Sequence, residues 1–133
     1  MKTLIVDDQF ENRKLLRDIM KPFGEYDMVS DGQQALELFE ADLLDGHPFD
    51  LVLLDIMMPG MDGQMVLERI RAMEREYQVP SNAEAAVFMV SALDSPRAVM
   101  EAYFKGGCTD YLTKPVTRQA LLDKLIDNGL IEG

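Results

Sequence analysis

Five polar residues stand directly after short apolar runs, in types and positions that suit phosphoryl chemistry. They are three aspartates, a serine and a lysine: Asp7, Asp8, Asp55, Ser91 and Lys114. The three carboxylates would all be ionised at neutral pH, because the ordinary pKa of aspartate is about 3.9. If they met in one place, their mutual repulsion would be costly unless a cation joined them.

The charges of this group favour a divalent cation. Three carboxylates and the Lys114 ammonium leave two negative charges, which one divalent ion balances. A site made only of oxygen ligands, with positions left for water and substrate phosphate, suits Mg²⁺ better than Zn²⁺. We therefore expect Mg²⁺ at Asp7, Asp8 and Asp55.

Asp55 is the best candidate for a nucleophile. It ends a fully apolar run and is followed by a turn, residues 56–60, that lets the chain curl around the carboxylate. A carboxylate can attack phosphorus to form an aspartyl phosphate, while a metal and an ammonium neutralise charge on the phosphoryl oxygens.

The elements that must position these residues alternate along the chain. Short apolar runs predict buried parallel strands at 4–6, 51–54, 87–90 and 111–112. A further strand is predicted at 26–29, where Asp27 interrupts the apolar run. Each strand is followed by a segment whose apolar residues recur at helical spacing, which predicts a helix. In the helix after the fourth strand, the apolar stripe consists of Val99, Met100, Tyr103 and Phe104. This order predicts an α/β fold of five βα units, with helices on both faces of a parallel sheet. Ligands of such sheets bind beyond the carboxyl ends of the strands, where all five polar residues stand.

Two acidic positions have a simpler interpretation. Asp8 with Glu11 also fits a helix-capping pattern, in which Asp8 would cap the following helix rather than bind a metal. Residues 74–76, with the sequence Glu-Arg-Glu, are expected to form a solvated helix face.

Composition excludes several other classes. The 133 residues suit one domain, and 24 acidic against 13 basic residues give a net charge of −11, which disfavours binding to nucleic acid or to anionic membranes. A single cysteine allows no internal disulfide and suits a reducing compartment. The N-terminal apolar run is too short for a signal peptide. We therefore expect a cytoplasmic protein.

Four segments resemble the motifs of a known family. They are Leu-Ile-Val-Asp-Asp at 4–8, Leu-Leu-Asp-Ile-Met-Met-Pro-Gly-Met-Asp-Gly at 53–63, Val-Ser-Ala at 90–92, and Asp-Tyr-Leu-Thr-Lys-Pro at 110–115. In order and spacing they resemble the response-regulator receiver domain, the CheY-like family of two-component signalling. The resemblance covers essentially the whole chain, and it implies a (βα)₅ fold with strand order 2-1-3-4-5.

The resemblance also implies roles for individual residues. Asp55 would accept a phosphoryl group from a histidine kinase or a histidine phosphotransfer protein. Asp7, Asp8, Asp55 and the backbone carbonyl of Met57 would bind Mg²⁺. Ser91 and Lys114 would contact the phosphoryl oxygens. Ser91 and Tyr111 would change position on phosphorylation and so act as the switch. The peptide bond between Lys114 and Pro115 would be cis.

Alternatives from other classes are weaker. A phosphatase of the haloacid dehalogenase type needs a second aspartate two residues after the nucleophile, and Met57 occupies that position. A P-loop is excluded because no glycine-rich loop leads into Lys-Ser or Lys-Thr. A third alternative is a receiver-like interaction module that is never phosphorylated. The presence of both Asp55 and Lys114 argues against it.

We therefore expect a signalling domain rather than an enzyme, with phosphotransfer and dephosphorylation as its only self-catalysed reactions. Residues 1–133 would form one receiver without an output domain. It would act by protein contact with an unknown target, as a monomer or as a dimer that forms on phosphorylation.

Overall fold

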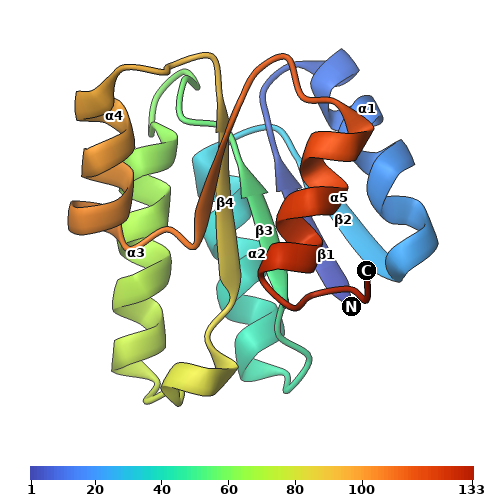
Figure 1. Ribbon diagram of the computed structural model, residues 1–133. Helices are drawn as coiled ribbons and strands as arrows, with labels where there is room; N and C mark the ends of the chain where they lie inside the picture. Colours follow the sequence, from blue (N-terminus) through green and yellow to red (C-terminus); the bar gives the residue numbers. More distant parts are fainter.

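A computed structural model describes all residues 1–133, and its centre is one five-stranded parallel sheet (Figure 1). The strands are β1 (Lys2–Val6), β2 (Glu25–Val29), β3 (Leu51–Leu54), β4 (Ala86–Ser91) and β5 (Asp110–Thr113). Their order across the sheet is β2-β1-β3-β4-β5. This confirms the CheY-like α/β fold and the strand order implied by the sequence.

The inner strands are apolar on both faces because helices cover both faces. In β1, Leu4 and Val6 point into one core while Ile5 points into the other. The same alternation divides β3 and β4 between the two cores, and every residue of β3 is inaccessible to solvent. Two hydrophobic cores, one on each side of the sheet, therefore stabilise the fold.

The helices divide into two layers (Figure 1). One core is closed by α1 (Phe10–Met20) and α5 (Arg118–Asp127). The other is closed by α2 (Gly32–Leu44), α3 (Gly63–Glu76) and α4 (Pro96–Met100), the last continued by a π-helical segment, η3 (Glu101–Gly106). Two 3₁₀ turns, η1 (Lys21–Phe23) and η2 (Ser81–Ala83), complete the chain. No helix combines the length and the apolar character that crossing a bilayer requires.

Side-chain caps begin four of the helices. Asp31, Asp62, Ser95 and Thr117 each accept a hydrogen bond from the backbone N–H three residues later. Asp8 does not act in this way, because the residue before α1 is Gln9 and no side chain caps that helix. The capping interpretation of Asp8 is therefore wrong.

The face of α4 and η3 that packs against α3 differs from the predicted stripe. Ala102 and Gly106 are buried, whereas Met100 and Phe104 are exposed by 57% and 83%. The reason is close approach, since a Cβ at Gly106 would lie 2.4 Å from a methyl group of Leu67. Small residues form this contact with α3. Of the predicted stripe, Val99 and Tyr103 pack against the core, whereas Met100 and Phe104 are exposed.

Glu74 was expected in solvent but is only 2% exposed. Its carboxylate accepts from Arg71 at 2.7 Å and from the backbone N–H of Ala85 at 2.7 Å. Arg71 also donates to the carbonyl oxygens of Ala85 and Gly107. A buried ion pair thus ties α3 to the segments before β4 and β5, a contact that helical periodicity does not reveal.

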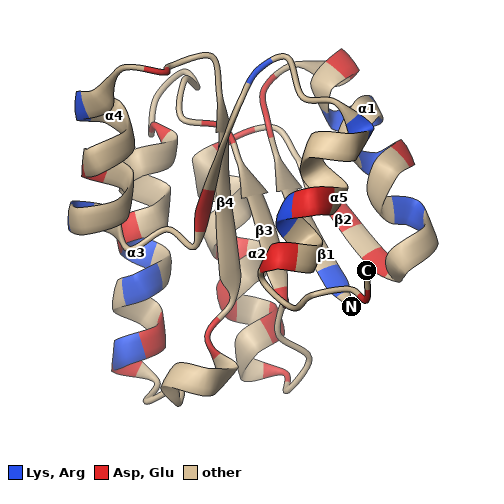
Figure 2. Cartoon of the chain, viewed as in Figure 1, with Lys and Arg blue, Asp and Glu red and all other residues tan.

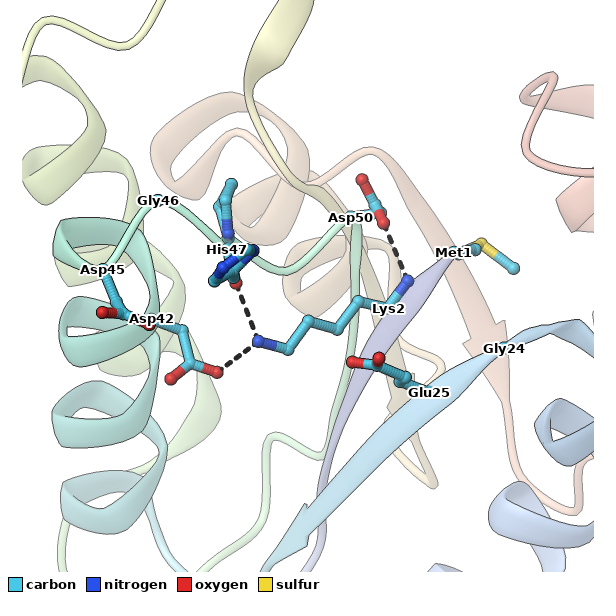
Figure 3. A pocket seen from close by; sticks show the side chains of 10 residues that line it. Met1, Lys2, Gly24, Glu25, Asp42, Asp45, Gly46, His47 and Asp50 are labelled. Carbon is cyan, nitrogen blue, oxygen red and sulfur yellow. Dashed lines mark hydrogen bonds and ion pairs between the residues drawn. The ribbon is translucent and has the colours of Figure 1, made fainter.

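A hollow of about 700 Å³ lies at the amino end of the sheet (Figure 3). Lys2 crosses it, and its Nζ donates to Asp42 at 2.6 Å and to the His47 carbonyl oxygen at 2.7 Å. The backbone N–H of Lys2 donates to Asp50. These bonds anchor the loop between α2 and β3 to β1, at the end of the sheet opposite the aspartate cluster.

Acidic and basic residues are interspersed over the elements visible in Figure 2. Three of the thirteen basic residues belong to α1 and three to α3. The net charge of −11 therefore comes from a general excess of acidic residues rather than from one acidic segment.

Candidate functional site

Three carboxylates converge at the carboxyl ends of β1 and β3. Val6 pairs with Leu54, so the residues that follow them, Asp7 and Asp55, become neighbours, and the Asp55 N–H donates to the Val6 carbonyl oxygen at 2.9 Å. One oxygen each from Asp7, Asp8 and Asp55 lie within 4.8 Å of one another. Asp7 is 1% exposed and Asp55 is 4% exposed, so two of the three charges are buried.

Lys114 reaches this cluster from two strands away. Ser91 of β4 pairs with Thr113 of β5, and the Lys114 N–H donates to the Ser91 carbonyl oxygen at 2.8 Å. The Lys114 Nζ lies 2.8 Å from Asp7 Oδ2 and 3.4 Å from Asp55 Oδ2. The bond from Lys114 to Pro115 is cis, as the resemblance implied.

Backbone groups fix the other oxygens of both buried carboxylates. Asp55 Oδ1 accepts from the Met57 N–H at 3.2 Å, and Asp7 Oδ1 accepts from the Gln9 N–H at 2.9 Å. The chain after Asp55 turns back so closely that a Cβ at Gly63 would collide with the Asp55 carbonyl oxygen. Glycine at 63 is therefore required for the approach of α3 to the end of β3.

The electrostatics favour a bound cation. Burial raises the pKa of Asp55 above its ordinary value, the Asp7 carboxylate raises it further, and the Lys114 ammonium opposes both effects. The single ammonium leaves two negative charges among the three carboxylates. All the donors are oxygens, so the set fits Mg²⁺, with Asp7, Asp8 and Asp55 as the groups that could hold it. The resemblance to receiver domains adds the Met57 carbonyl to this set.

Ser91 and Tyr111 are connected through the backbone of one residue. Ser91 is fully buried, and its hydroxyl accepts from the Leu93 N–H at 3.2 Å. The Tyr111 hydroxyl donates to the Leu93 carbonyl oxygen at 2.6 Å. Burial raises the pKa of Tyr111, whose ring belongs to the core under α3 and η3. The backbone of Leu93 therefore lies between the hydroxyl groups of Ser91 and Tyr111 and is hydrogen-bonded to both.

Sequence reasoning missed Arg13. Its guanidinium donates to the Asp7 carbonyl oxygen at 2.8 Å and lies 5.9 Å from the centre of the Phe10 ring. This bond ties α1 to the segment that presents two of the carboxylates. The only indication of this contact in the sequence is that Arg13 is a basic residue near the start of the helix that follows Asp7 and Asp8.

The sequence of the chain matches the response regulator receiver domain family over residues 3–126. The chain belongs to this family. Receiver domains are parts of two-component signalling systems, and the chain has relatives in two kinds of protein. It is 33% identical over 121 residues to the sensor protein GacS of Pseudomonas syringae pv. syringae, matching 90% of this chain and 12% of GacS. It is 35% identical over 127 residues to the nisin biosynthesis regulatory protein NisR of Lactococcus lactis subsp. lactis, matching 96% of this chain and 49% of NisR. The chain thus spans about half or less of the relatives it matches.

Solved receiver structures share this fold. The CheX–CheY–BeF₃–Mg²⁺ complex from Borrelia burgdorferi matches with a TM-score of 0.83 and 29% identity, over 97% of this chain and 89% of that chain. The receiver domain of the histidine kinase CKI1 from Arabidopsis thaliana, complexed with Mg²⁺ and BeF₃⁻, matches with a TM-score of 0.77 and 27% identity, over 96% and 89%.

Proposed function

We propose that this receiver domain accepts a phosphoryl group on Asp55 from a phosphohistidine of a histidine kinase or a histidine phosphotransfer protein. The observation that carries the proposal is the convergence of Asp7, Asp8 and Asp55 within 4.8 Å, with the Lys114 ammonium 3.4 Å from Asp55. Relatives that include sensor kinases and a regulatory protein support it.

In the proposed reaction, a carboxylate oxygen of Asp55 attacks phosphorus. The bond from phosphorus to the donor imidazole nitrogen breaks, and its electron pair stays on that nitrogen. Lys114 stabilises the negative charge of the phosphoryl oxygens, and the Ser91 hydroxyl is a further donor to them. When bound, Mg²⁺ would supply additional positive charge to those oxygens. The Met57 N–H holds one Asp55 oxygen in place, which orients the carboxylate for attack.

The donor would approach beside α1. An apolar hollow of about 300 Å³ adjoins Lys114 and is lined by Leu15, Leu16 and Val116 among others. Phe10 and Leu15 of α1 are exposed by 61% and 42%. A partner that packs on these side chains would bring a histidine close to Asp55, since α1 begins next to Asp8.

Phosphorylation would then act through Ser91 and Tyr111. A phosphoryl group brings about −1.5 to −2 charges and strong acceptor oxygens, which would draw the Ser91 hydroxyl away from Leu93. Rearrangement at Leu93 would move Tyr111 and alter the surface around η3, β5 and α5. We propose that residues 1–133 work as one domain in the cytoplasm and signal by protein contact through this surface, with dimer formation as one outcome.

Acetyl phosphate labelling tests the proposal. The wild-type protein should be retarded on a phosphate-affinity gel when Mg²⁺ is present and not when it is chelated. Asp55→Asn and the double variant Asp7→Asn with Asp8→Asn should not be labelled, whereas Asp45→Asn, which changes an exposed aspartate at the end of α2, should be labelled like wild type. Labelling of the Asp55→Asn variant at the wild-type rate would refute the assignment.

A further inference from the structure

Two consecutive methionines after Asp55 lie in opposite environments. Met58 is 7% exposed and packs in the core, whereas Met57 is 59% exposed. The other methionines exposed by more than a third of their surface are less so, at 57% for Met100, 44% for Met65 and 38% for Met28. Met57 is therefore the most exposed methionine of the chain, and its side chain is open to a small oxidant dissolved in water.

Met57 is also held next to the phosphoryl-acceptor carboxylate. Its N–H donates to Asp55 Oδ1 at 3.2 Å, so its side chain starts from the rim of the site. The methionine side chain is long, unbranched and flexible, and it can cover a group on Asp55. Leu93, the second residue after Ser91, adds another apolar side chain that packs against the core. Neither side chain offers a strong hydrogen bond to water.

We propose that Met57 is a redox-sensitive modification site: a hydroperoxide converts its thioether to the sulfoxide, and this shortens the lifetime of the phosphoryl group on Asp55. The inference rests on the proposed phosphorylation of Asp55. It adds an oxidant of stated class as a second input to the same site.

The oxidation step balances with the hydroperoxide alone. A lone pair on the Met57 sulfur attacks the terminal peroxide oxygen, the O–O bond breaks and an S–O bond forms. The sulfur loses two electrons and the peroxide gains them, and after proton transfer the peroxide leaves as an alcohol or, from hydrogen peroxide, as water.

The sulfoxide reverses the local polarity. Its oxygen is a strong acceptor, and it can bind and orient a water molecule that attacks phosphorus and cleaves the bond between phosphorus and the Asp55 oxygen. The products are inorganic phosphate and the free carboxylate. The rate increase should be about two- to tenfold, the range that one neutral hydrogen bond provides.

The test uses the intact protein and hydrogen peroxide. Wild type, Met57→Leu and Met100→Leu are oxidised, freed of peroxide, labelled with acetyl phosphate and then freed of the donor. Loss of the label is followed on a phosphate-affinity gel, and sulfoxide at each methionine is measured by peptide mass spectrometry. Each protein is compared with its own unoxidised form, and a further sample is treated with methionine sulfoxide reductases before labelling.

Wild type and Met100→Leu should lose the label about two- to tenfold faster after oxidation, in proportion to sulfoxide at Met57. Met57→Leu should show no such change, and the reductases should restore the original lifetime in wild type. An unchanged lifetime with Met57 oxidised, an equal response in Met57→Leu, or oxidation of Met100 without Met57 would overturn the inference and leave the proposed function intact. Failure to label untreated wild type would overturn both.

Discussion

At the scale of single residues, the site is built from side chains that backbone groups hold in place. Asp55 Oδ1 is bound by the Met57 N–H and Asp7 Oδ1 by the Gln9 N–H, which leaves their Oδ2 atoms facing Lys114. Such fixed donors orient a nucleophile without using its charge partner. With the carboxylates fixed in this way, the side chains on the solvent side of the site decide whether water can approach a group bound to Asp55.

The two apolar side chains beside the site, Met57 and Leu93, should affect how long a phosphoryl group stays on Asp55. Hydrolysis needs a water in line with the bond from Asp55 to phosphorus, and neither Met57 nor Leu93 can orient it. The double variant Met57→Asn with Leu93→Glu should shorten the lifetime severalfold, measured as loss of label after removal of acetyl phosphate. Equal hydrolysis in variant and wild type would show that water access at these positions does not set the rate.

The raised pKa of Asp55 makes a prediction about stability. Because the folded state holds this proton more tightly than the unfolded chain, its contribution is present at low pH and is lost as pH rises through the folded pKa. At pH 7 the ionised carboxylate therefore destabilises the domain, and Asp55→Asn should raise the melting temperature by a few degrees in Mg²⁺-free buffer.

That gain should disappear well below the ordinary aspartate pKa of about 3.9, where Asp55 is protonated in both the folded and the unfolded state. Thermal unfolding between pH 3 and pH 7 measures the difference. A lower melting temperature for Asp55→Asn at pH 7 would contradict the account.

At the scale of elements, sequence patterns predicted strands better than they predicted contacts between helices. All five predicted strands are present. The inner strands β1, β3 and β4 come from fully apolar runs because a strand covered by helices on both faces must be apolar on both, and this also placed Asp7, Asp55 and Ser91 at one end of the sheet. The edge strand β2 has no buried residue and carries the polar Asp27. The predicted stripe of the fourth helix was half right, since Val99 and Tyr103 pack against the core but Met100 and Phe104 are exposed. The small residues Ala102 and Gly106 are buried in their place. Close packing of helices depends on small residues, which hydrophobic periodicity does not weigh.

Glu74 shows the same limit for polar contacts, and it provides a test. Removing one partner of a buried ion pair leaves a charge without compensation, so Glu74→Ala should cost about 3–5 kcal/mol of unfolding free energy. Glu76→Ala, at the exposed end of the same helix, should change it by less than about 0.5 kcal/mol. Urea unfolding of both variants decides the matter, and similar midpoints would mean that the contact of Glu74 with Arg71 and Ala85 does not stabilise the fold.

At the scale of the whole molecule, the two ends of the sheet differ in what they hold. The carboxyl end brings together the candidate site, while the amino end is closed by the bonds of Lys2 to Asp42 and His47. From the site, a hydrogen-bonded route leads through Ser91 and Leu93 to Tyr111, whose ring lies in the core beneath η3. We propose that a change of charge at Asp55 acts on Tyr111 along this route.

The route predicts that Ser91 couples phosphorylation to Tyr111. With excess acetyl phosphate, wild type and Ser91→Ala should both become labelled, but only wild type should show altered ring signals of Tyr111 in NMR spectra of tyrosine-labelled protein. Tyr111→Phe assigns those signals. Equal changes in Ser91→Ala and wild type would show that the coupling does not pass through the serine hydroxyl.

The central claim is that Asp55 itself accepts the phosphoryl group, and locating the group tests it most directly. After labelling with acetyl phosphate and Mg²⁺, reduction with borohydride converts a phosphorylated aspartate into homoserine, which peptide mass spectrometry identifies. We expect homoserine at position 55 and at no other aspartate, and none when Mg²⁺ is chelated. Homoserine at Asp7 or Asp8, or its absence from position 55 in fully labelled protein, would contradict the account.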